Sequence, residues 1–221
     1  MADFHPIYET ALKHEGGFQK FPNDAANYVK GKLIGTNRGI SALAWYNHYK
    51  RIPTEADMRS LTKEQAYEIY KKNFWNKING DRIHNQSVAE MMFSFVIGTG
   101  ASLISDLKDI AGAVAGKKLM ASLDTPITDK EADLINSIDQ RLYWNTLKAW
   151  RHRFYLKLVE KKPELKKFLK GWQRRLNSYR FVPSPGDPKA KPVKPTGKKV
   201  FVVILILLLL FALWLFLIRK R

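Results

Sequence analysis

Hydrophobic side chains recur at helical spacing along most of the chain. In the first such stretch, apolar residues three and four positions apart predict a helix that buries one face, formed by Phe4, Ile7, Tyr8, Ala11 and Leu12. Gly16 and Gly17 follow, and glycine readily adopts the left-handed backbone that ends a helix. The helix is therefore predicted to end close to Glu15.

The same periodicity predicts further helices downstream. Ser41 is a predicted N-cap, and Thr62–Gln65 and Thr128–Glu131 have the form of capping boxes, in which two side chains satisfy free amides at a helix start. Beyond the helices that begin at 41 and 62, helical patterning covers residues 87–97, 101–116, 128–162 and 165–177, with a break at Pro163. The run 87–97 is apolar on several sides, as in a central buried helix. These patterns predict a mainly α fold.

Residues 19–39 interrupt the helical pattern. They are rich in Asn, Gly, Asp and Lys, with isolated Val, Leu and Ile residues, which is typical of an irregular or weakly β segment. We expect this small irregular or β excursion after the first helix to place Asp24 and Thr36 over the helix end that carries Glu15.

The C-terminal part has a different composition. Residues 183–199 contain five prolines among Lys and Gly, which predicts an extended linker. Residues 200–218 carry no charge and have the length of a membrane-spanning helix, with basic residues on both sides. The sequence therefore predicts a single C-terminal transmembrane helix in the lipid bilayer, which is the host cell inner membrane if the protein is phage-encoded; a buried core helix is the alternative. The N-terminus lacks the pattern of a cleavable secretion signal.

Charge and residue usage narrow the function classes. The chain has no Cys, which excludes disulfides and thiolate chemistry, and its net charge of +18 indicates a polyanionic partner. Residues 141–180 are strongly basic and interleaved with aromatic residues, so nucleic-acid binding and an ordinary solvated helix face are both alternatives there. We favour anionic lipid or cell wall and expect no nucleic acid. The scattered histidines lack metal-ligand spacing, so neither a metal nor a cofactor is predicted.

Two carboxylates and a hydroxyl form the candidate catalytic group. Glu15 would lie in the last turn of the first helix, where the negative end of the helix dipole raises the pKa of a carboxyl, as a proton donor needs. Asp24 follows nine positions later, and glycoside hydrolysis uses such a pair: an acid that protonates the leaving oxygen, and a carboxylate that activates water or stabilises the cationic transition state. Thr36 is a candidate for orienting that water. An ordinary helix cap at Glu15 and a turn residue at Asp24 are the alternatives.

The motifs around these residues resemble a known family. His14-Glu15-Gly16-Gly17-Phe18, Asp24 and Thr36-Asn37-Arg38-Gly39-Ile40-Ser41 are similar to the N-terminal signature of glycoside hydrolase family 108, the N-acetylmuramidases. Leu61–Ala66, Tyr70, Phe74-Trp75 and Lys170–Arg175 follow in the family's order, so the resemblance spans about residues 4–180. It implies a lysozyme-like helical fold and an enzyme that cleaves the bond between N-acetylmuramic acid and N-acetylglucosamine in bacterial peptidoglycan, with Glu15 as general acid. In an anchored protein this activity would serve phage-type host lysis.

The resemblance also implies a domain plan, and the chain departs from the family at two places. The resemblance implies a catalytic region at 1–87 and a helical peptidoglycan-binding region at 88–182, and the composition adds the linker at 183–199 and the transmembrane helix at 200–218. The segment Ala25–Gly35 is longer than in the family, and Ser94 and Ile97 replace the polar residues Asp and Asn of its central helix. These changes motivate a second hypothesis, a catalytically silent module that tethers cell wall or membrane.

Overall fold

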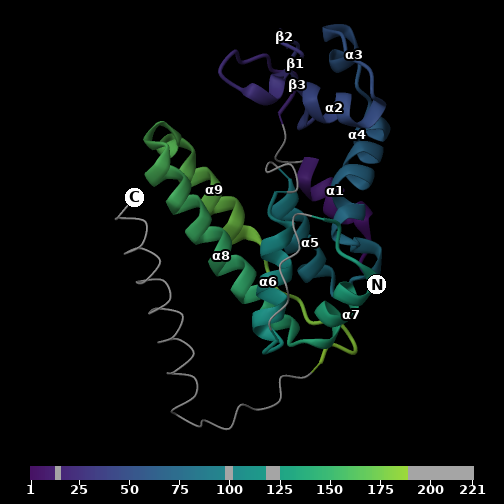
Figure 1. Ribbon diagram of the computed structural model, residues 1–221, viewed down its shortest axis with the longest axis vertical. Helices are drawn as coiled ribbons and strands as arrows, with labels where there is room; N and C mark the ends of the chain where they lie inside the picture. The colour runs from purple at the N-terminus through teal and green to yellow at the C-terminus, as the bar shows by residue number, and fades with distance from the viewer. Residues whose placement is uncertain (13–15, 98–101, 118–124, 189–221) are drawn as a thin grey trace. The chain divides into compact units, whose positions relative to one another are not determined.

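The structure, a computed structural model, describes residues 1–12, 16–97, 102–117 and 125–188. Residues 1–188 form one compact unit with a continuous hydrophobic core. The unit is mainly helical, and its strands are confined to the segment that follows the first helix, which confirms the predicted fold class for this part of the chain (Figure 1).

The first helix, α1 (Phe4–Leu12), packs against the core as its pattern predicts. Phe4, Ile7 and Tyr8 are each 2–3% exposed. The Phe4 ring lies 5.1 Å from that of Trp75 and 5.4 Å from that of Phe93, so α1 is fixed by aromatic contacts to residues 71 and 89 positions away.

Two β-hairpins make up the excursion. A short 3₁₀ turn, η1 (Ala25–Asn27), leads into β1 (Tyr28–Val29), which pairs antiparallel with β2 (Lys32–Leu33). The strands β3 (Thr36–Asn37) and β4 (Ile40–Ser41) form the second hairpin. Each turn holds a basic residue and a glycine with positive φ, Lys30-Gly31 and Arg38-Gly39, the backbone of a type I′ turn.

Helices α2 to α4 follow the hairpins. Helix α2 (Ala42–Tyr49) begins at Ser41, whose Oγ accepts from the Ala44 amide, and α4 (Lys63–Tyr70) begins at the Thr62–Gln65 capping box, so both predicted helix starts are confirmed. Helix α3 (Glu55–Arg59) lies between them, where the sequence pattern indicated only a connection. Helix α4 continues through a π turn, η2 (Lys71–Trp75), into the 3₁₀ turns η3 (Asn76–Ile78) and η4 (Gly80–Arg82).

Helix α5 (Gln86–Val96) is the central buried helix that its composition predicts. On one side Phe93 joins the aromatic cluster of α1 and η2, and on the other the Phe95 ring lies 5.2 Å from that of Trp150 in α8 (Gln140–Lys161). Helix α6 (Ile104–Val114) also packs against α8.

The segment from 128 to 162 is two helices, where the sequence pattern indicated continuous helix. Helix α7 (Asp129–Ser137) begins at the predicted capping box and ends before Ile138, and α8 starts anew at Asp139, whose carboxylate accepts from the Leu142 amide. After η5 (Pro163–Leu165), α9 (Lys166–Ser178) lies beside α8 as a helical hairpin, so the break at Pro163 is confirmed (Figure 1).

The predicted transmembrane helix, residues 200–218, and most of the predicted linker lie outside the described residues. Within the part of the chain that the structure describes, none of the helices is both long and apolar enough to cross a membrane.

Candidate functional site

A cleft of about 800 Å³ lies beside the hairpins. Its lining comes from the excursion, from α2 and from the segment between α4 and η3, and Ile97 at the end of α5 contributes to it. Asp24 and Thr36 both line the cleft, so the structure brings these two candidate residues to one cavity. The third, Glu15, lies outside the described residues.

Hydrogen bonds to both oxygens orient the Asp24 carboxylate. Its Oδ1 accepts from the Ala26 amide at 3.0 Å, which makes Asp24 the N-cap of η1, and its Oδ2 accepts from Gln19 Nε2 at 3.4 Å. Asp24 is therefore a turn residue, which was the alternative to a catalytic role, and it also lines the cleft. The capping bond sets the direction of the carboxylate without closing it off from solvent.

Thr36 is oriented by a buried amide. Its Oγ1 donates to Asn27 Oδ1 at 2.6 Å, and Asn27 is completely buried. Asn27 in turn donates to Gln19 Oε1 at 2.9 Å and to the Phe21 carbonyl oxygen at 3.1 Å, which fixes its amide. Because the hydroxyl hydrogen of Thr36 is committed to Asn27, its oxygen is left to accept from a ligand or water in the cleft.

Helix α1, which precedes Glu15 in the sequence, is tied to α4 by a side-chain hydrogen bond. Tyr8 Oη donates to the Lys63 carbonyl oxygen at 2.6 Å, at the start of α4. Burial, reinforced by the nearby charge of Glu9, raises the pKa of Tyr8 to about 12. The phenol therefore stays protonated and serves as a fixed donor that ties α1 to α4.

The segment after the glutamate is held against the hairpins and α3. Gln19 and Thr36 exchange two backbone hydrogen bonds of 2.8 Å each. The Arg59 guanidinium lies 3.9 Å from the centre of the Phe18 ring, and Lys20 Nζ lies 2.7 Å from Glu55 Oε2. Each residue from Phe18 to Lys20 thus has a partner on another element.

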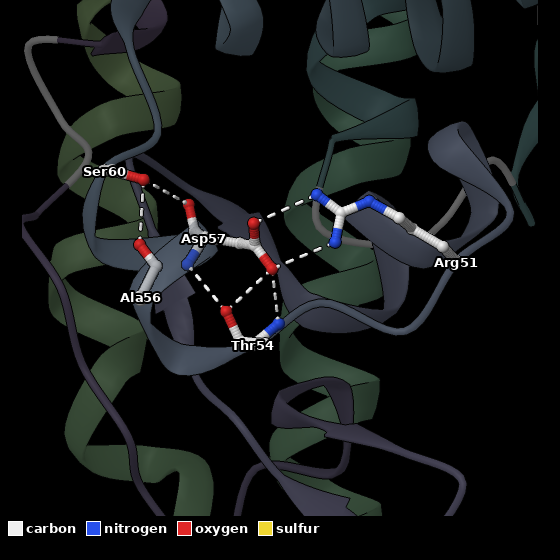
Figure 2. Close-up of polar contacts among 5 residues, drawn as sticks. All are labelled: Arg51, Thr54, Ala56, Asp57 and Ser60. Atoms are coloured by element: carbon white, nitrogen blue, oxygen red, sulfur yellow. Dashed lines mark hydrogen bonds and ion pairs between the residues drawn. The ribbon is translucent and has the colours of Figure 1, made fainter.

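A network of its own stabilises α3, the helix that braces this segment. Figure 2 shows the Asp57 carboxylate between the Arg51 guanidinium and the amide and hydroxyl of Thr54. The hydrogen bonds from Arg51, followed by those from Thr54, hold the pKa of Asp57 well below its usual range. The carboxylate therefore stays ionised at neutral pH and keeps the capping box of this short helix closed.

Gly35 sits where the hairpins meet the braced segment, and no side chain fits there. Its φ is +125°, and a Cβ would lie 2.7 Å from the Gln19 carbonyl oxygen and 2.8 Å from the Phe18 ring. We expect Gly35→Ala to lower the free energy of unfolding by about 2 to 4 kcal/mol, from backbone strain and overpacking together.

Gly31→Ala is the matched control for this prediction. Gly31 also has a positive φ, +78°, but a Cβ added there would meet no atom within 4 Å. Gly31→Ala should therefore lose only the stability that the strained backbone costs, about 1 kcal/mol. Urea unfolding of both variants measures the difference. Equal losses of stability would contradict the close contact at Gly35.

The two departures from the family have different structural outcomes. Ser94 Oγ donates to the Met91 carbonyl oxygen at 2.6 Å within α5, so this hydroxyl is satisfied by its own helix. Ile97, by contrast, lines the cleft with an apolar side chain. The longer segment 25–35 forms η1 and the first hairpin, where Lys30 Nζ lies 6.0 Å from the Tyr46 ring centre.

Several residues of the site escaped the sequence analysis. Gln19 and Asn27 connect Asp24 to Thr36, and Lys50 and Lys77 are cationic side chains in the cleft lining. No spacing singles them out, because a polar loop residue that is buried looks in sequence like one that is solvated. Among the residues that the structure describes, no group of three or more His, Asp or Glu is placed to hold a metal ion.

One family of known proteins matches the part of the chain that lines the cleft. Residues 8–100 match the family described as Glycosyl hydrolase 108, and this range contains Asp24, Thr36 and the position of Glu15. The match supports a glycoside hydrolase that acts on peptidoglycan.

Among solved structures, the chain is similar to that of Brucella abortus SagA, with a TM-score of 0.60 and 24% sequence identity. The similarity covers 79% of this chain and 89% of that one, and at this identity it shows a shared fold. No curated protein sequence matches the chain.

Proposed function

We propose that this protein is an N-acetylmuramidase that cleaves the glycan bond between N-acetylmuramic acid and N-acetylglucosamine in peptidoglycan. The observation that carries the proposal is the cleft, which gathers Asp24 and Thr36 within the very range that matches the glycosyl hydrolase family. Glu15 donates a proton to the glycosidic oxygen as the bond to the sugar C1 breaks. A water molecule then completes the hydrolysis at C1.

The described residues support distinct roles for Asp24 and Thr36. The oriented carboxylate of Asp24 either takes a proton from the attacking water or stabilises the positive charge that develops on the sugar. The Thr36 oxygen, with its hydrogen committed to Asn27, accepts a hydrogen bond from that water. Release of reducing ends from purified peptidoglycan by residues 1–188 tests the proposal, and a wild-type fragment that releases none contradicts it.

A catalytically silent tether is the second candidate, and Ile97 favours it. An apolar side chain in the lining removes a polar contact that would help to position a sugar. This candidate predicts that residues 1–188 sediment with peptidoglycan and release no reducing ends. Release of reducing ends by the wild type excludes it.

We further propose that residues 200–218 anchor the protein in a membrane, and that the enzyme serves phage-type lysis of a bacterial host. The support is the uncharged composition and length of this stretch and the basic residues at both of its ends. In cells that express the full chain, we expect it to stay in the membrane pellet after extraction with alkaline carbonate. Residues 1–188, expressed in the same way, are the control and should be released. Release of the full chain under these conditions contradicts the anchor.

A further inference from the structure

More than half of the protein's excess positive charge lies in the hairpin of α8 and α9. Residues 140–178 contain twelve Lys and Arg and two Glu, a net charge of +10 out of +18 for the chain. Near the turn of the hairpin the cations form two stripes with a spacing of four residues, which places each stripe on one helix face. The exposed residues are Arg153, Lys157 and Lys161 on α8, and Lys166, Lys170 and Arg174 on α9. We call residues 153–174 the basic tip.

The protein itself does little to neutralise the basic tip. Seven of its cations have no carboxylate within 4.0 Å among the described residues: Arg153, Lys161, Lys162, Lys166, Lys167, Lys170 and Arg174. The surroundings of α3 differ in this respect, because Lys20, Arg51 and Arg59 all have acidic partners on that helix. Like charges at this density raise the local potential and attract a polyanion.

The basic tip also exposes apolar side chains, and Phe168 lies beside Lys167, off the stripe of Lys166, Lys170 and Arg174. Leu156 is 42% exposed and Phe168 is 47% exposed. The Phe168 ring is stacked on Trp172, with ring centres 6.0 Å apart, and Lys167 Nζ lies 5.1 Å from the Phe168 ring centre. Aromatic and aliphatic groups beside Lys and Arg are the composition of a helix that lies in the interface of an anionic bilayer.

We propose that the basic tip binds the surface of an anionic phospholipid bilayer. The cations contact lipid phosphates, while Leu156 and Phe168 enter the region between the head groups and the acyl chains. The aliphatic Leu156 distinguishes this partner from nucleic acid and from glycan, since neither offers an apolar layer beside its charges. The surface uses none of the residues assigned to hydrolysis, so the proposal is independent of the enzymatic activity.

The proposed anchor would keep this surface close to lipid. Residues 189–199 separate the described unit from the uncharged stretch, and at about 3.1 Å per residue they reach on the order of 35 Å. The basic tip would give the body a second, weaker and salt-sensitive attachment. Such an attachment limits how freely the body moves on its linker.

Sedimentation of residues 1–188 with vesicles tests the proposal. The hydrophobic core of the described residues lies entirely within this fragment. We expect binding to vesicles of phosphatidylcholine with about 30% phosphatidylglycerol to be at least tenfold tighter than to phosphatidylcholine alone, and to fall by a similar factor between about 50 and 500 mM salt. The triple substitution K166Q/K170Q/R174Q should weaken this binding about tenfold or more.

A matched variant separates the basic tip from net charge. K32Q/K72Q/K117Q removes the same charge from exposed lysines elsewhere and should leave vesicle binding within about twofold of the wild type. Equal weakening by the two triple variants, or no preference for anionic vesicles, overturns the proposal. The proposal is also overturned if the wild type does not bind vesicles but binds duplex DNA or peptidoglycan sacculi, and if K166Q/K170Q/R174Q loses that binding. Because no substrate is present, these outcomes do not depend on the proposed hydrolysis.

Discussion

Glu15→Gln is expected to lower the release of reducing ends from peptidoglycan by about 10²- to 10⁴-fold, the range that a positioned general acid contributes. Glutamine keeps the size and polarity of the side chain but has no proton to give to the leaving oxygen. The substitution should therefore reduce kcat and leave binding to peptidoglycan nearly unchanged. Reducing-end assays with residues 1–188, together with co-sedimentation of the same fragment with sacculi, measure both quantities.

Glu9→Gln is the matched control for this result. Glu9 lies on α1, six positions before Glu15, and it does not line the cleft. Its substitution should leave activity within about twofold of the wild type, as for most surface changes. Undiminished activity of Glu15→Gln would refute the assignment of the acid, and an equal loss in both variants would point to damage to α1 instead.

Glu131→Gln is expected to destabilise the fold by about 2 to 4 kcal/mol, because it leaves a buried cation without its partner. Lys108 on α6 is 2% exposed, and its Nζ lies 3.1 Å from Glu131 Oε1 and 3.1 Å from Thr125 Oγ1. Lys108→Met removes the buried charge and fills the space, so it should cost about 1 kcal/mol. Urea unfolding of the two variants tests this asymmetry, and a larger cost for Lys108→Met would contradict it.

The contribution of Glu131 should vanish in acid. Burial raises the pKa of its carboxyl, but hydrogen bonds from Thr128 and Lys108 lower it by more, so it lies below the ordinary value of 4.5. A carboxyl with a lower pKa in the folded state stabilises the fold above its unfolded pKa and loses this effect as the pH falls through the folded value. The stability difference between wild type and Glu131→Gln should therefore be constant near neutral pH and shrink below about pH 4.5. A difference that is independent of pH would show that the carboxylate charge is not responsible.

Local rules predicted the parts of the fold that local chemistry determines. The stripe of α1, the caps at Ser41, Thr62 and Thr128, and the break at Pro163 all depend on residues close together in sequence, and the structure has each of them. The helix α3 was missed because the residue three positions after Thr54 is Asp57, where the usual capping box has Glu or Gln. The break between α7 and α8 was missed because Ile138 continues the apolar pattern while Asp139 starts a new helix.

Residues of the candidate site could be predicted from the sequence only where their side chains carry a group that can take part in catalysis. Asp24 and Thr36 drew attention as a carboxylate and a hydroxyl, and they do line one cleft. Asn27 and the Lys20–Glu55 contact were not predictable, because they depend on hairpin turns at Lys30-Gly31 and Arg38-Gly39 that bring distant segments together. The role of Glu15 stays a prediction.

Helix α5 bears on how this protein can be divided or recombined. Its Phe93 completes the aromatic cluster of the N-terminal segments, its Phe95 packs on Trp150 of the C-terminal hairpin, and it ends immediately before Ile97 in the cleft lining. In a chimaera of two related proteins, a junction within or just before this helix would bring together contact surfaces from different proteins in a single hydrophobic core. Exchange of the second half between relatives should therefore succeed only when α5 travels with matched partners on both of its faces.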